Sequence, residues 1–235
     1  MAPSSRTGNE GGIIIYGLLT RFIYFLCWFI FMKRILYSGA EAHLYLEGDR
    51  LVKERISKNY RHKFIDNMKR KYPTRREFKI LTKARKIGMN VPDVYEVDEI
   101  EMKVVMEFVK GDNLKEKLDS YDRKKREEVC KKIGIQMAKM HDNNIIHGDL
   151  TTSNMILKSG KVFFIDFGLG YISVKIEDKA VDLHLLRQAF ESKHFKYSEE
   201  LFKNALKGYK KLENFKEILE RLEIVEKRGR YKRKN

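Results

Sequence analysis

Two short polar motifs constrain this chain more than any other feature of its sequence. Residues 147–154 read HGDLTTSN, and a D-F-G turn follows at 166–168. Carboxylate and amide oxygens are the hard ligands that Mg²⁺ prefers, so Asp166 and Asn154 are candidate metal ligands. Asp149, five positions before Asn154, is a candidate base that orients a hydroxyl acceptor and receives its proton. The spacing therefore predicts a site for phosphoryl transfer.

The sequence around these motifs predicts the local structure that such a site needs. Apolar residues recur at helical spacing over 124–144, and an Asn-Asn pair can end that helix. Residues 155–157 and 162–165 are typical of a short hairpin whose second strand delivers Asp166. A polar turn without chemistry is the alternative interpretation. Two motifs in register, each in its expected local structure, argue against it.

A second half of the site is predicted upstream. Lys53 lies in a strand over 51–55, and a strand lysine can hold the α- and β-phosphates of a nucleotide. Residues 74–87 predict a helix on which Glu77 points inward, so that it can pair with Lys53. The alternative is a T-x-x-E capping box, in which Glu77 bonds back to the backbone of Thr74. We favour the pair with Lys53.

Two further segments complete the predicted nucleotide site. A loop of small residues with one glycine follows the first strand, and such a loop lets backbone N–H groups approach phosphate. The loop consists of Ser38, Gly39, Ala40, Glu41 and Ala42. Residues 106–111 end a strand and fit the hinge whose backbone would bond adenine, with Glu107 and Val109 as its contacts. A simple strand end is the competing interpretation.

Together these motifs resemble one family, the small atypical kinase/ATPase subunit of the KEOPS complex. This bud-site-selection kinase family occurs in archaea and eukaryotes. The resemblance spans about residues 33–234. It is carried by GAEA at 39–42, VKER at 52–55, RRE at 75–77, HGDLTTSN at 147–154, DFGLG at 166–170 and KAVDL at 179–183. RIO-type kinases are the nearest competitor, and they generally lack the full D-F-G turn.

The resemblance implies an α+β, two-lobed protein-kinase-like fold with a small β-rich N-lobe and a trimmed helical C-lobe. It implies ATP and Mg²⁺ as cofactors and support of threonylcarbamoyladenosine (t6A) formation on tRNA. The implied partners are tRNA, the tRNA-modifying transferase subunit and the other KEOPS subunits. ATP-site roles pass to Lys53, Glu77, Asp149, Asn154 and Asp166. His147 and Asp182 would brace the catalytic loop, with the carboxylate of Asp182 accepting loop N–H groups.

Several parts of a signalling kinase are missing. Only fifteen residues separate Asp166 from Asp182 and no A-P-E follows, so the activation segment is too short for a peptide platform. Gly148 stands where an arginine would receive an activation-loop phosphate. The site therefore suits ATP hydrolysis, autophosphorylation or a narrow substrate. Two other function classes stay open, namely a protein Ser/Thr kinase with a defined partner and a noncatalytic RNA-binding adaptor. The intact catalytic set argues against the adaptor.

The charge of the chain is strongly positive and unevenly placed. Its net charge is +16, and residues 53–86 hold fourteen basic side chains against three acidic ones. A second cluster, the basic segment 227–235, contains Lys227, Arg228, Arg230, Lys232, Arg233 and Lys234. Such clusters are often solvated faces. Two of them also predict contact with a polyanion, here tRNA phosphates. Cys27 and Cys130 are unlike a disulfide framework, which indicates a reducing compartment and a cytoplasmic location.

The N-terminal segment has two interpretations. Residues 13–32 form an apolar run long enough to span a bilayer, and Lys33-Arg34 would then leave the kinase in the cytoplasm. The alternative is that translation begins at Met32, which we favour because a tRNA-modification subunit gains nothing obvious from a membrane. The predicted organisation is an extension over 1–31, a kinase-like domain over 32–226 with lobes at 32–108 and 109–226, and the basic segment.

Overall fold

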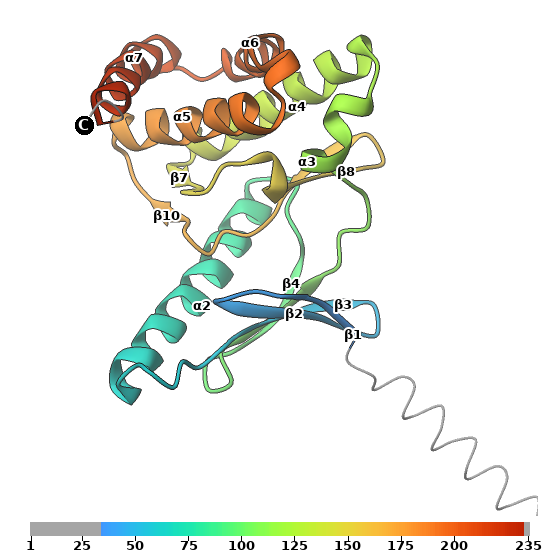
Figure 1. Cartoon of the computed structure of the whole chain (residues 1–235), viewed down its shortest axis with the longest axis vertical. Coiled ribbons are helices and arrows are strands. Elements are labelled where there is room, and N and C mark those ends of the chain that lie inside the picture. The colour runs from blue at the N-terminus through green and yellow to red at the C-terminus, as the bar shows by residue number, and fades with distance from the viewer. Residues whose placement is uncertain (1–33, 233–235) are drawn as a thin grey trace, which may run out of the picture.

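The computed structural model describes residues 34–232. The predictions for the extension 1–31, for Cys27 and for Arg233 and Lys234 lie outside the described residues. Figure 1 shows two lobes, with a sheet and one long helix below and a group of helices above. The α+β, two-lobed architecture predicted from the sequence is confirmed.

The lower lobe is built on a five-stranded antiparallel sheet. Its spatial order is β1-β2-β3-β5-β4. The strands are β1 (Arg34–Ser38), β2 (Ala42–Glu47), β3 (Arg50–Arg55), β4 (Val94–Asp98) and β5 (Lys103–Glu107). The turn between β2 and β3 requires a left-handed backbone at Gly48, whose φ is +63°. Lys53 lies in β3, the central strand of this sheet, so the backbone at Lys53 is held by strands on both sides.

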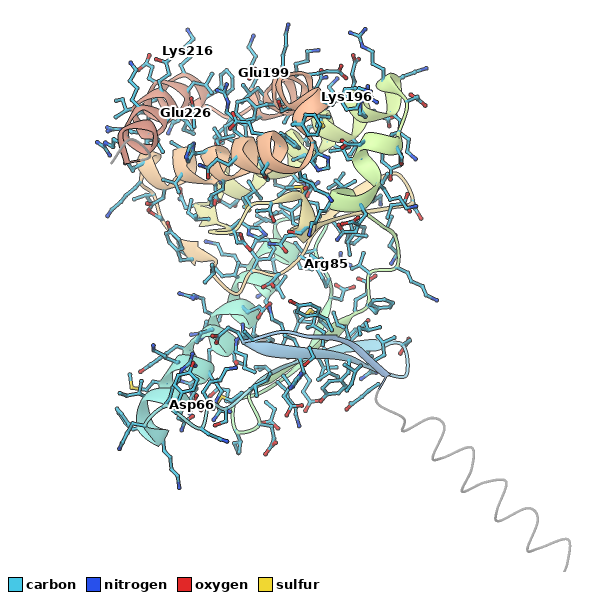
Figure 2. All side chains as sticks on the ribbon, in the orientation of Figure 1. Asp66, Arg85, Lys196, Glu199, Lys216 and Glu226 are labelled. Carbon is cyan, nitrogen blue, oxygen red and sulfur yellow. The ribbon has the colours of Figure 1, made fainter. Side chains whose placement is uncertain are left out.

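The long helix α2 (Lys63–Lys86) differs from the sequence prediction of a helix over 74–87. It begins eleven residues before Thr74 and carries Pro73 in its interior. Its first turn is anchored by the buried Asp66, which accepts hydrogen bonds from Ser57 Oγ at 2.8 Å and from the Lys58 backbone N–H at 3.1 Å. Figure 2 shows Asp66 near the outer end of α2. This tertiary anchor outweighs the helix-breaking tendency of the proline.

The upper lobe consists of helices around a hairpin. Its helices are α3 (Leu114–Lys117), α4 (Arg123–Asp142), α5 (Ile176–Lys193), α6 (Ser198–Tyr209) and α7 (Phe215–Lys232). The hairpin is β8 (Met155–Lys158) and β9 (Lys161–Phe164), as predicted, and β6 (Asp112–Asn113) pairs with β8. The two-residue strands β7 (Ile145–Ile146) and β10 (Tyr171–Ile172) pair with each other. Strand β7 directly precedes the catalytic loop, and β10 follows the D-F-G turn. The predicted helix over 124–144 is α4.

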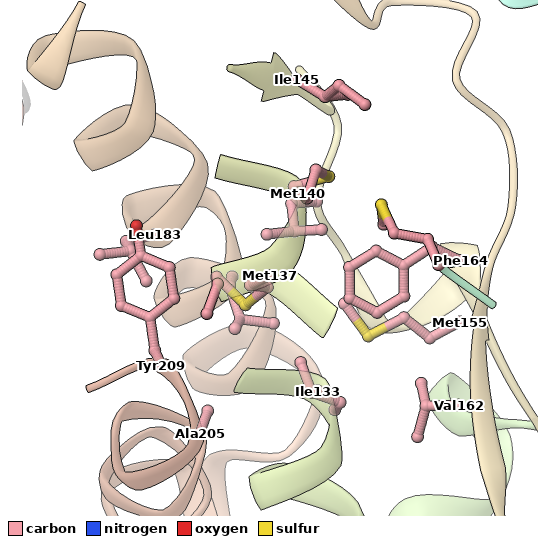
Figure 3. Packing of buried hydrophobic residues seen from close by; sticks show 14 of the residues in the cluster. Ile133, Met137, Met140, Ile145, Met155, Val162, Phe164, Leu183, Ala205 and Tyr209 are labelled. Carbon is pink, nitrogen blue, oxygen red and sulfur yellow. The ribbon is translucent and has the colours of Figure 1, made fainter. Parts of the chain in front are cut away.

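The core of the upper lobe lies on both faces of α4. Figure 3 shows Ile133, Met137 and Met140 between Tyr209 on one side and Phe164 on the other. Helices α4 and α6 touch through glycines: a Cβ on Gly134 would lie 1.8 Å from the backbone oxygen of Ala205. Close packing of this kind makes α4 a rigid support for the loop that follows it.

The basic segment does not begin as a separate tail. Helix α7 continues to Lys232, so residues 227–232 are its last turns, and Arg228 bonds to Glu177 at 2.8 Å. Helix α7 therefore runs through the predicted boundary at 226/227, and the division of the chain at this point stays a prediction. Within residues 34–232, none of the helices has both the length and the apolar composition that crossing a bilayer requires.

Candidate active site

The catalytic loop is held by the buried carboxylate of Asp182 on α5. Its Oδ2 accepts the backbone N–H of His147 at 2.7 Å, and its Oδ1 accepts that of Gly148 at 2.9 Å. The bracing contact predicted for Asp182 is therefore present. His141 on α4 donates to the same carboxylate from Nε2 at 3.2 Å and contacts Tyr209 Oη through Nδ1 at 2.6 Å. This extension of the brace was not predicted from the sequence.

Gly148 is required by the backbone geometry of the loop. Its φ is +76°, and a Cβ at this position would lie 2.7 Å from the backbone oxygen of Leu169. An arginine would be strained here and would push the activation segment away. The glycine thus allows the segment after D-F-G to pack directly on the catalytic loop.

His147 is a neutral, oriented side chain. Its Nε2–H donates to the backbone oxygen of Ile165 at 3.2 Å, and its Nδ1 accepts the backbone N–H of Asp149 at 3.3 Å. Burial lowers the pKa of His147 despite the nearby carboxylates, which agrees with a ring that donates at one nitrogen and accepts at the other. The ring also packs on Phe167, with centroids 4.5 Å apart. His147 therefore links the catalytic loop to the D-F-G turn.

Asn154 and Asp166 present oxygens to the same space. The amide nitrogen of Asn154 donates to the backbone oxygen and to Oδ2 of Asp149, each at 2.9 Å, which leaves Asn154 Oδ1 as the free acceptor. Asp166 has a φ of +59°, an unfavourable backbone state of the kind found at functional sites. Within the described residues, no three His, Cys, Asp or Glu side chains converge as a protein-only metal site would. Two oxygens completed by phosphate and water instead fit Mg²⁺.

An alternating chain of four charges connects α2 to the D-F-G turn. Lys53 Nζ donates to Glu77 Oε1 at 2.9 Å and to Asp166 Oδ1 at 2.6 Å. Arg55 donates to the other Glu77 oxygen at 2.5 Å. The Lys53–Glu77 ion pair is thus present, and the capping-box alternative is wrong because Thr74 lies inside α2. Arg55 was not predicted as a site residue, although its position two residues after Lys53 places both on one face of β3.

The charges in this chain shift one another's pKa values. Burial alone would raise the pKa of Asp166, but the charge and hydrogen bond of Lys53 outweigh it and lower that pKa. Burial alone would lower the pKa of Lys53, and Glu77 and Asp166 together raise it. Both side chains are therefore charged at neutral pH, as metal and phosphate binding require.

A cleft between the lobes has the size and walls expected for a nucleotide. Its volume is about 610 Å³, within the usual range for small-molecule sites. Its apolar walls include Leu44, Leu51, Met106, Val109, Ile156 and Ile165, and its polar end includes Lys53, Asn154 and Asp166. The side chain of Glu107 bonds to Lys158 at 2.6 Å, so only its backbone is suited to the predicted adenine contact.

The predicted phosphate-covering loop lines a second cavity of about 530 Å³ beside the cleft. Gly39, Ala40, Glu41 and Ala42 line it together with Lys53, Asp149 and Asp166, whereas Ser38 is turned toward His43 at 2.9 Å. The loop closes through a bond from the Gly39 N–H to Ala42 O at 3.0 Å. Arg61 also bonds to Glu41 at 3.3 Å, so contacts with the next loop hold a turn that has only one glycine.

Comparison with known proteins agrees with this geometry. The chain matches the RIO domain family over residues 41–177. Two solved structures share the fold. The Rio2 kinase–ADP/Mg²⁺–phosphoaspartate complex from Chaetomium thermophilum has a TM-score of 0.56 and 13% identity, and the match covers 83% of this chain and 70% of that one. WaaP in complex with acyl carrier protein has a TM-score of 0.58 and 12% identity, and the match covers 86% of this chain and 89% of that one. Fold and site together define a RIO-type atypical kinase.

Sequence relatives narrow the class. The chain is 46% identical over 215 residues to KEOPS complex subunit Bud32 of Pyrococcus abyssi, covering 86% of this chain and 98% of that protein. It is 41% identical over 207 residues to EKC/KEOPS complex subunit bud32 of Dictyostelium discoideum, covering 83% and 82%. This chain belongs to the Bud32 family of KEOPS complex subunits. The chain thus matches both the broader RIO domain family and, within the sequence relatives, the Bud32 subunits of KEOPS complexes.

Other relatives are longer proteins. The chain is 40% identical over 200 residues to a probable bifunctional tRNA threonylcarbamoyladenosine biosynthesis protein of Methanobrevibacter smithii, which covers 83% of this chain. The chain spans only 36% of the length of that relative. The similarity therefore concerns one part of the bifunctional protein.

Proposed function

We propose that this chain is the ATP- and Mg²⁺-dependent kinase/ATPase subunit of a KEOPS complex and supports t6A modification of tRNA. The observation that carries the proposal is the joint placement of Asp149, Asn154 and Asp166 beside the Lys53–Glu77 pair. The named relatives supply the biological setting, namely KEOPS complexes and t6A biosynthesis. A cytoplasmic location and contact with the transferase subunit follow from that role.

The residues divide the work by position. Asp149, held by the amide of Asn154, would orient the acceptor and take its proton. Asn154 Oδ1 and Asp166 would hold Mg²⁺, and Lys53 would hold the nucleotide phosphates. When bound, Mg²⁺ would supply positive charge that offsets the charge on the phosphate oxygens. His147 and Asp182 keep the loop in place, so their contribution is orientation rather than contact with substrate.

The length and packing of the activation segment limit which phosphoryl acceptors the site can use. Residues 167–175 run directly from the D-F-G turn to α5, which begins at Ile176. Leu169 packs on Gly148, so little space remains for a peptide platform. Water, the chain itself or one docked partner fits this arrangement better than many peptide substrates do. We therefore favour ATP hydrolysis or a narrow phosphoryl transfer over a general protein kinase.

The decisive experiment measures Mg²⁺-dependent ATP turnover of the full chain, alone and with tRNA and the transferase subunit. Asp166→Ala should abolish turnover, because losing an electrostatic partner of this kind costs about 3–4 kcal/mol of barrier or more. Asp149→Asn should be nearly inactive but still bind nucleotide. Asp49→Asn, in the exposed β2–β3 turn, is the control and should match the parent.

Each outcome selects one function class. Turnover of Asp166→Ala within a few-fold of the parent would reject the assigned metal role. Phosphorylation of one added partner without phosphate release would favour the protein kinase. Binding of tRNA with no ATP turnover under any condition would favour the RNA-binding adaptor.

A further inference from the structure

A second buried histidine contacts the catalytic loop at Thr152, away from the contacts that His141 and Asp182 make. His194, at the C-terminal end of α5, lies 2.7 Å from Asp119 Oδ1 through Nδ1 and 3.0 Å from Thr152 Oγ1 through Nε2. The His194 side chain is 0% exposed, and Thr152 is 2% exposed. Three segments far apart in the sequence thus meet at one imidazole.

The carboxylate of Asp119 fixes the direction of the first of these bonds. A carboxylate can only accept, so Nδ1–H of His194 donates to Asp119. In the neutral ring Nε2 then carries no proton, and it accepts from the hydroxyl of Thr152. In either direction the hydroxyl of Thr152 is bonded to His194, and this bond fixes the rotamer of the threonine.

The order carboxylate–imidazole–hydroxyl is also that of a nucleophilic triad. Here the threonine that carries the hydroxyl is 2% exposed, so no substrate can reach it. The side chain of Asp119, in contrast, is 45% exposed. This series of hydrogen bonds is therefore accessible to solvent at its carboxylate and not at its hydroxyl. The geometry therefore suits holding a residue in place and excludes attack on a substrate.

Thr152 begins the short turn η2 (Thr152–Asn154), which carries a candidate metal ligand. Within this turn the Asn154 N–H donates to Thr151 O at 3.0 Å. The N–H of Ile165 in turn donates to Asn154 O at 3.0 Å, and Ile165 directly precedes Asp166. A shift of the turn would consequently displace both candidate metal ligands.

We propose that His194 is a positioning residue that sets the metal-binding geometry of Asn154 and Asp166 through the hydroxyl of Thr152. The inference rests on the proposed function, because it uses the metal roles assigned there. Partners that orient metal ligands typically change metal affinity by about 10–100-fold when they are removed. His194 should therefore control the Mg²⁺ requirement more than nucleotide binding itself.

The test uses the full chain and two readouts, the thermal stabilisation by ADP at increasing Mg²⁺ and the Mg²⁺ dependence of ATP turnover. Thr152→Val removes the hydroxyl with little change of volume, and His194→Ala removes the imidazole. Each should raise the half-saturating Mg²⁺ concentration about tenfold or more, with metal-free ADP binding unchanged. The double variant should be no worse than either single one, since the residues act as a unit.

Two controls separate positioning from general loss of stability. Thr152→Ser keeps the hydroxyl and should keep the Mg²⁺ requirement of the parent. The second control is His184→Ala. His184 lies on α5, and its Nδ1 has no hydrogen-bond partner within the described residues, so its loss should leave the Mg²⁺ requirement unchanged. A merely structural role would lower the melting temperature of the variants without changing the Mg²⁺ dependence of the folded protein.

The inference is overturned if folded Thr152→Val shows the Mg²⁺ requirement of the parent, or if the two substitutions are additive. If His194→Ala does not fold, Thr152→Val and Thr152→Ser decide the question alone. A parent that binds Mg²⁺ with ADP but does not turn over ATP refutes the proposed activity and leaves the thermal test valid. A parent whose ADP binding ignores Mg²⁺ refutes the metal site and this inference together.

Discussion

At the residue scale, Glu77 is the acidic centre of the site. It is 1% exposed and contacts two cations, Lys53 and Arg55, whereas a kinase needs only one for its lysine–glutamate pair. Because Arg55 also contacts Glu77, the buried carboxylate keeps a partner when Lys53 turns to a nucleotide phosphate. Arg55 would thus separate the stability of this ion-pair network from the proposed phosphate-binding role of Lys53.

This division predicts different effects for substitutions at Glu77 and at Lys53. Glu77→Ala leaves two cations without their buried partner and should lower the free energy of unfolding by about 3–5 kcal/mol. Lys53→Met should cost less stability, because Arg55 still neutralises Glu77, yet it should abolish ATP turnover. Denaturant unfolding and turnover assays measure the two effects. Equal stability loss in both variants would show that Arg55 does not compensate.

At the element scale, the contact between α4 and α6 supports the catalytic loop. The two helices cross where Gly134 faces Ala205 and Gly208 faces Lys131, and a Cβ on Gly208 would lie 2.1 Å from the backbone oxygen of Lys131. Backbone cannot yield as a flexible side chain does. Gly134 and Gly208 lie inside helices, and only the crossing of these helices shows why glycine is needed there.

Gly134→Ala should therefore destabilise the chain, although alanine favours helices. The added methyl forces α4 and α6 apart, and overpacking of this kind costs about 1–3 kcal/mol or more, which exceeds the gain of about 1 kcal/mol in helix propensity. Thermal or denaturant unfolding measures the change. Gly48→Asn is the control, since no atom lies within 4 Å of its Cβ and asparagine tolerates a positive φ. A Gly134→Ala variant more stable than the parent would refute the packing argument.

At the scale of the whole molecule, the two lobes meet at the candidate nucleotide cleft, and the charge is spread over both lobes. The cationic cluster 53–86 includes α2 in the lower lobe, and the basic segment begins on α7 in the upper lobe. Some of these positive charges are neutralised by carboxylates of the same chain: Arg55 pairs with Glu77, and Arg228 pairs with Glu177. The proposed contact with tRNA would therefore rely on cations without such partners.

Neutralising the end of α7 should weaken tRNA binding while preserving the ATP site. Lys227, Arg230 and Lys232 are replaced by Gln, with Arg228 kept because it bonds to α5. Each lost phosphate contact should reduce the slope of log affinity against log salt by about 0.7–0.9. Lys210, Lys211 and Lys216 replaced by Gln form the matched control, with the same change in charge elsewhere on this lobe. Identical salt slopes for both triple variants would refute a specific role of the α7 end.

The sequence alone determined the kinase-like class and the hairpin, and it singled out the catalytic-loop and D-F-G residues as the proposed site. Those residues lie in contiguous motifs whose types and spacing are dictated by one chemistry, so neighbours along the chain suffice to identify them. The start of α2 was predicted wrongly, at Thr74, because T-x-x-E resembles a helix start when the tertiary contacts of Asp66 are not known.

Only the tertiary structure decided what holds the site together. It joined Arg55 to Glu77 across 22 positions, His141 to Asp182 across 41 and Thr152 to His194 across 42. Such contacts depend on where helices cross and which groups are buried together, and no local pattern encodes them. Asp182 was the exception, because its place in a family motif implied its role before its partners were seen.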